Sequence, residues 1–122
     1  MRYLIDTSSF IDMVERHWYD RLVADERVTD LMTIPDVLRE LETLAQGGGT
    51  RARNARSALR FARQTLKVAH GPVTERHADD ALIASAREHA WGIISQDHAL
   101  ISRAREHGIP TLTLTRSGSI GD

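Results

Sequence analysis

The chain of 122 residues contains no cysteine, so disulfides, zinc–thiolate sites and cysteine nucleophiles are excluded. It has only two residues each of Phe, Trp and Tyr, too few to predict an aromatic surface for stacking single-stranded nucleic acid. No apolar run approaches the length of a membrane-spanning helix, and no signal-peptide pattern opens the chain. We therefore expect a cytoplasmic protein without a leader and without membrane contact.

Lysine is almost missing. Of the 16 basic residues all but Lys67 are arginine, and the net charge is −1. Codon usage in a GC-rich genome gives the same bias, so the position of the arginines is more informative than their number. Residues 51–63 (RARNARSALRFAR) hold no acidic residue, and a helix over 50–64 aligns four arginines along one face. The arginines of this face are Arg53, Arg56, Arg60 and Arg63. The face is open to three interpretations, namely RNA backbone contact, a solvated helix surface or docking of an acidic partner.

Short apolar segments alternate with helical patterns along the chain. We predict strands at 2–5, 31–34, 66–69, 92–95 and 111–114. Helices are predicted over 7–16, 18–26, 35 to the glycines at 47–49, 50–64, 76–90 and 99–107. This alternation predicts an α/β three-layer sandwich, with a mostly parallel central sheet and helices on both faces. Residues 1–116 form a single domain in this prediction, and residues 117–122 form a flexible tail.

Acidic residues fall at positions that suggest a common site. Asp6 and Asp97 each follow a predicted strand, and the carboxyl ends of parallel strands meet at one edge of the sheet. Asp79 lies in the middle of the apolar face of the helix over 76–90, and Asp80 lies at the edge of that face. A buried acid costs free energy unless it is paired or metal-bound. The alternative is that the amides at the helix N-terminus satisfy Asp79.

A further acid is expected on the helix that follows Pro35. Glu40 and Glu42 flank its apolar stripe on opposite sides, and periodicity alone does not choose between them. Carboxylate oxygens are the ligands that Mg²⁺ and Mn²⁺ prefer, and two such ions assist in-line displacement at phosphate. The pattern therefore indicates metal-assisted cleavage of phosphodiesters with one or two ions.

At this point the sequence resembles the PIN-domain ribonucleases over nearly its whole length. LIDTS matches the opening strand, acid and small hydroxyl residue of that family, and IPDVLRELETLA matches its helical glutamate with Glu40. ADDALIASA matches the acid that begins a helix, where spacing favours Asp79 over Asp80. ISQDHAL matches the last motif with Asp97. The four motifs occur in the order and at the intervals of the family.

The resemblance implies a metal-dependent endoribonuclease that acts on RNA through a metal-activated water. The carried-over catalytic and metal-binding residues are Asp6, Glu40, Asp79 and Asp97, with Asp80 as an additional ligand. Thr7 and Ser95 are expected to orient the carboxylates or water. Two branches of the family fit, namely VapC toxins blocked by an antitoxin protein and Fcf1-type proteins that process ribosomal RNA. The family also implies a homodimer.

Two other classes compete with this reading. A catalytically inactive PIN-like module would bind RNA or protein and use the acids structurally, although all four expected acids are present. A response-regulator receiver also gathers acids at strand ends, but it carries a lysine near its last strand. The single lysine of this chain, Lys67, lies elsewhere, which argues against a receiver.

Overall fold

The computed structural model describes residues 1–69 and 77–122. In this part of the chain the strands form one six-stranded sheet with the order β3-β2-β1-β4-β5-β6. The strands are β1 (Arg2–Ile5), β2 (Asp30–Thr33), β3 (Lys67–Val68), β4 (Gly92–Ser95), β5 (Thr111–Leu114) and β6 (Ile120–Gly121). All neighbouring strands are parallel except β5 and β6, which are antiparallel.

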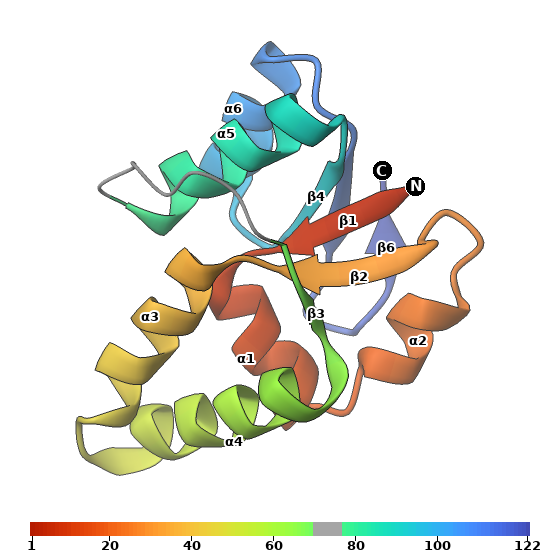
Figure 1. Ribbon diagram of the computed structural model, residues 1–122. Coiled ribbons are helices and arrows are strands. Elements are labelled where there is room, and N and C mark those ends of the chain that lie inside the picture. Colours follow the sequence, from red (N-terminus) through yellow and green to blue (C-terminus); the bar gives the residue numbers. More distant parts are fainter. Residues whose placement is uncertain (70–76) are drawn as a thin grey trace.

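Helices cover both faces of the sheet, which confirms the predicted fold class. They are α1 (Thr7–Glu15), α2 (Tyr19–Ala24), α3 (Pro35–Ala45), α4 (Gly49–Thr65), α5 (Ala78–His89) and α6 (His98–Glu106). Figure 1 shows α5 and α6 on one side of the sheet and α1, α3 and α4 on the other. In the described residues, no helix is long and apolar enough to span a bilayer.

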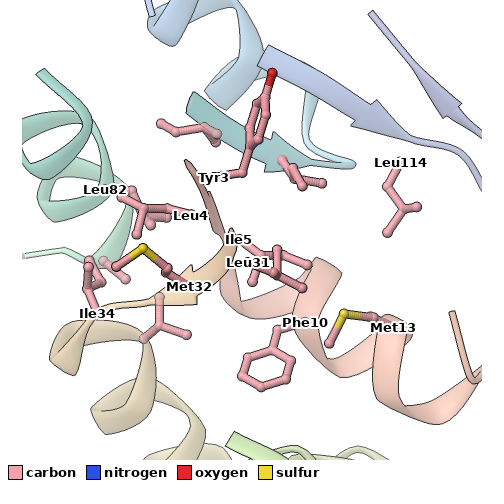
Figure 2. Close-up of a cluster of buried hydrophobic side chains, with 14 of the residues drawn as sticks. Tyr3, Leu4, Ile5, Phe10, Met13, Leu31, Met32, Ile34, Leu82 and Leu114 are labelled. Atoms are coloured by element: carbon pink, nitrogen blue, oxygen red, sulfur yellow. The ribbon is translucent and has the colours of Figure 1, made fainter. Parts of the chain in front are cut away.

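The core is built around the central strand β1. Leu4 and Ile5 are fully buried, as expected for a parallel strand covered on both faces. Figure 2 shows Phe10 and Met13 of α1 packed on one side of this strand and Leu82 of α5 on the other. The register of β1 against β2 and β4 is therefore fixed by side chains that are buried away from water on both faces of the sheet.

The strand order of the sheet reverses between β1 and β4. From β1 it moves outward to β2 and β3, and from β4 it moves outward to β5 on the opposite side. The two strands that start these halves are direct neighbours, so their carboxyl ends border a topological switch point. Open α/β sheets bind ligands in the crevice at such a point.

The predicted elements agree with the structure to within a few residues, and one expectation is corrected. Arg76 and the strand-ending pair Gly71-Pro72 lie outside the described residues. The tail at 117–122, predicted to be flexible, instead contributes β6, which pairs with β5. Arg21 donates to the Ser117 carbonyl, and Arg27 forms an ion pair with Asp122. These partners are distant in sequence, so the local pattern of the tail could not indicate them.

Gly92 allows β4 to approach β1. It lies beside Tyr3 in the register, and a Cβ built at Gly92 would overlap the Tyr3 ring and lie 2.9 Å from the Pro110 carbonyl oxygen. We expect Gly92→Ala to lower the free energy of unfolding by about 1–3 kcal/mol, because backbone and a packed ring must shift. Urea unfolding tests this, with Gly121→Ala as the control, since a Cβ at Gly121 meets nothing within 4 Å. Equal stability of the two variants would contradict the assigned strand packing.

Candidate active site

Four acidic residues line one cavity at the switch point. The cavity has a volume of about 300 Å³ and lies at the carboxyl ends of the strands. Asp6 is contributed by the turn after β1, Glu40 by α3, Asp79 by the first turn of α5, and Asp97 by the turn after β4. The remaining lining residues lie at the start of α1 and around the start of α5: Thr7, Ser8, His77 and Ala78.

Asp6 is the most deeply buried of these acids. Its side chain is only 5% exposed and caps α1 by accepting a hydrogen bond from the Ser9 amide at 3.3 Å. Burial raises the pKa of Asp6 to about 6, hydrogen bonds from Ser9 and Ser95 oppose the rise, and the nearby Asp79 adds to it. The carboxylate form of Asp6 is thus held in the protein at a cost in free energy.

Ser95 connects the two strand ends. Its hydroxyl donates to Asp6 Oδ2 at 3.0 Å and accepts from the Asp97 amide at 2.9 Å. Asp97 in turn caps α6 by accepting from the amides of Ala99 and Leu100. A fully buried hydroxyl with both of its roles used orients two acids at once.

One acid of each candidate pair, Asp79 with Asp80 and Glu40 with Glu42, lines the cavity. Asp79 lines the cavity, whereas Asp80 points to Arg103 with a 2.6 Å contact and is not a lining residue. Glu40 lines the cavity, whereas Glu42 lies 3.6 Å from Arg63 on the other side of α3. In the described ranges no group donates a hydrogen bond to Asp79, so the expected alternative of amide capping is not found there.

The surroundings of Asp79 disfavour its charge. Its pKa is raised first by burial and then by the negative charges of Asp97 and Glu40. Arg103 opposes the rise, and Asp80 adds slightly to it. Mutual repulsion of this kind is relieved by a cation placed among the acids.

Several residues near the cavity were not singled out from the sequence. The Ser9 hydroxyl accepts from the Gln96 amide at 2.9 Å and so links α1 to the turn after β4. Arg51 donates to the Ser8 hydroxyl at 3.3 Å, which brings one guanidinium to the rim. His77 lines the cavity as the residue before α5. Serine and arginine are common on surfaces, and the contact of Arg51 with Ser8 became evident only from the packing of α4 against α1.

The predicted arginine row lies on α4 but not in this cavity. Arg53, Arg56, Arg60 and Arg63 are all exposed. The last three line a separate hollow of about 360 Å³ with Leu59 and Gln64. Arg56 donates to the Ala45 carbonyl at 2.8 Å, so α4 is tied to the end of α3.

The chemistry of the cavity fits a hard divalent cation that retains waters. Its acidic lining offers oxygen ligands, and the buried Thr7 hydroxyl has no hydrogen-bond partner among the described residues. Within residues 1–69 and 77–122, however, no three His, Cys, Asp or Glu side chains are grouped closely enough to hold a metal ion directly. Mg²⁺ commonly binds through one or two carboxylates and several waters, so wider spacing is compatible with it.

The comparisons with known proteins define the class. The family model described as "PIN like domain" matches residues 14–117, and the chain therefore belongs to the PIN-like domain family, whose domains are generally nucleases. The matched range includes Glu40, Asp79 and Asp97 and begins after Asp6. A comparison with the curated proteins returned no match.

A solved structure supports the fold. The chain is similar to a domain of a functionally unknown protein from Methanocaldococcus jannaschii DSM 2661, with a TM-score of 0.68 and 20% sequence identity. The alignment covers 93% of this chain and 91% of that one. At this identity the likeness establishes the arrangement of strands and helices, and the function must be argued from the site.

The pKa of Asp6 generates a prediction about pH. Because this pKa is raised from 3.8 to about 6, the folded state holds a proton between these pH values that the unfolded state has lost. The stabilisation from this proton is complete below pH 3.8 and disappears as the pH rises through about 6. We expect Asp6→Asn, measured by urea unfolding in EDTA, to abolish this decline and to raise the free energy of unfolding at pH 8 by about 1–3 kcal/mol.

The matched control is Asp20→Asn on the exposed first turn of α2, which makes the same change of charge away from the cavity. It should leave the decline in place. A stability profile of Asp6→Asn that parallels wild type would show that Asp6 is not the group responsible.

Proposed function

We propose that this protein is a metal-dependent endoribonuclease that hydrolyses RNA phosphodiesters at the acidic cavity. The observation that carries the proposal is that acids from four separate elements line one small polar cavity at the switch point of the sheet. A purely structural role would be met by ion pairs, as for Asp80 and Glu42. Membership of the PIN-like domain family supports the same reaction class.

Asp6, Glu40, Asp79 and Asp97 are the proposed ligands of one or two Mg²⁺ or Mn²⁺ ions. Bound there, the cation supplies Lewis-acid stabilisation of the phosphate and a water nucleophile at neutral pH. The chain itself holds Asp6 and Asp97 in place through Ser95. The Thr7 hydroxyl, which has no partner within residues 1–69 and 77–122, is proposed to hydrogen-bond water or substrate. Asp80 is set aside as a principal ligand because Arg103 neutralises it.

Arginines outside the cavity are proposed to hold the RNA backbone. Arg51 reaches Ser8 at the rim, and Arg53, Arg56, Arg60 and Arg63 expose guanidinium groups along α4. Contacts of this kind bind phosphate without reading sequence. We propose either a toxin of a VapBC-type pair, blocked by an antitoxin protein, or an Fcf1-like enzyme of ribosomal RNA processing, in both cases as a homodimer. If an antitoxin gene lies beside the gene of this protein, the first role is indicated.

One observation favours a second candidate, a catalytically inactive PIN-like module that binds RNA or protein. In the described part of the chain, the acids do not come close enough to hold an ion directly. Such a module would bind RNA equally well in EDTA and in Mn²⁺ and would release no shorter products.

The test of the nuclease is cleavage of a mixed structured RNA pool in Mg²⁺, Mn²⁺ or EDTA. We expect cutting in the metals and none in EDTA. Asp79→Asn should reduce the rate by roughly 100-fold or more, because it removes a proposed ligand, while the melting temperature stays equal or rises as repulsion is relieved. Asp80→Asn is the matched neighbour and should keep most of the activity. Equal loss in both variants would contradict the assignment of Asp79.

Glu40 and Glu42 provide an independent pair on one helix. Glu40→Gln removes a charge that faces the cavity, and Glu42→Gln removes one that faces Arg63. We expect the first to lower the cleavage rate by roughly 10-fold or more and the second to change it less than about twofold. Single-turnover rates at saturating Mn²⁺ measure the effect. A larger loss for Glu42→Gln would show that the wrong face of α3 has been assigned.

A further inference from the structure

A second and larger cavity lies at the same edge of the sheet. Its volume is about 600 Å³, within the range of small-molecule sites. Asp12 of α1 and Arg16 at its C-terminal cap line it together with Gln96 and His98 at the start of α6. Thr113 and Leu114 at the end of β5 and the two residues that follow complete the lining. It is thus formed on the β5 side of the switch point, whereas α3 and α5 contribute to the acidic cavity.

The two cavities meet at one turn. Asp97 lines the acidic cavity, and its sequence neighbours Gln96 and His98 line the second one. Ser95 and Ser9 hold this turn, through the amides of Asp97 and Gln96 respectively. The two cavities therefore border the same turn at residues 96–98.

The charges of the second cavity differ from those of the first. It is lined by two arginines, Arg16 and Arg116, and by one acid, Asp12. In the part of the chain that the structure describes, neither guanidinium has a carboxylate within 4.0 Å, whereas Arg27 and Arg103 each pair with one. Unpaired guanidinium groups directed into a hollow are suited to phosphate.

Other lining groups fit the rest of a nucleotide. Arg16 lies 5.4 Å from the centre of the Trp18 ring, which restrains its position. The exposed His98 ring offers surface for a base, and the Thr113 hydroxyl offers a hydrogen bond. Asp12 offers a carboxylate that can accept hydrogen bonds from ribose hydroxyl or base amino groups.

We propose that this cavity binds the nucleotide of the RNA strand next to the one cut, with Arg16 and Arg116 on its phosphate. This inference rests on the proposed function in that the RNA is cut at the acidic cavity, but binding in the second cavity does not need turnover. It assigns the strand a path across Gln96 and His98, and it separates the residues that hold substrate from those that act on the scissile phosphate.

The experiment measures binding of a fluorescent, short single-stranded RNA of mixed sequence in EDTA by anisotropy. We expect Arg16→Ala/Arg116→Ala to bind about tenfold more weakly than wild type. The slope of log Kd against log salt should fall by about 0.7, the value for one phosphate contact on a single strand. The control is Arg2→Ala/Arg87→Ala, which removes the same charge from residues outside both cavities.

Arg16→Gln/Arg116→Gln keeps part of the packing on Trp18 and guards against loss of fold, which the melting temperature reports. Equal binding by the folded cavity variants and the control would overturn the proposal. Competition of the RNA by an acidic peptide at equal concentration would also overturn it, in favour of a protein partner.

Cleavage kinetics distinguish this failure from failure of the nuclease. If the enzyme cuts RNA, the cavity variants should raise KM by about tenfold and leave kcat within about twofold, because the lost contact serves binding. If wild type binds RNA through Arg16 and Arg116 but does not cut it, the proposal stands and the proposed nuclease activity fails. If it cuts RNA with unchanged KM in the variants, the reverse holds.

Discussion

The buried hydroxyl of Ser95 joins the two strand ends on which the acidic cavity is built. It donates to Asp6 after β1 and accepts from the amide of Asp97 after β4, so the ends of neighbouring strands are held by one side chain. This contact lies at the switch point of the sheet, where the two halves of the chain diverge. The positions of α1 and α6 depend on it as well, because Asp6 and Asp97 are their caps. One hydroxyl thus couples helix capping, strand spacing and the placement of two acids.

Holding acids side by side costs free energy, and favourable packing in the remainder of the fold offsets this cost. Burial and repulsion raise the pKa of Asp6 and of Asp79. The opposing contribution comes from the apolar side chains of β1, packed on both faces by α1 and α5. Functional sites commonly carry such destabilising arrangements. A cavity of this kind is more stable with a cation inside it, since binding to the folded state alone stabilises a protein.

Most of the fold was predictable from the sequence, and so was part of the lining of the acidic cavity. The apolar runs before Asp6 and Asp97 placed both acids at strand ends, because a short buried strand has few alternatives. Periodicity could not choose Glu40 over Glu42, since the choice depends on how α3 is rotated against its neighbours. The family motif supplied that choice. The pairing of β6 was missed for a similar reason, because the edge of β5 and Arg27 lie far from it in the chain.

A net charge of −1 conceals how the charges are arranged around this edge of the sheet. Acids border the switch point between β1 and β4, while Arg16 and Arg116 border the neighbouring hollow beside β5. A uniformly acidic edge would repel a polyanion, and a uniformly basic one would bind RNA without holding a cation. In the proposed binding mode, adjacent regions of opposite sign attract the RNA at one point and let it approach carboxylates at the next. The turn over residues 96–98 contributes lining residues to both regions. The order of charges along the edge, more than their sum, therefore determines what this fold can bind.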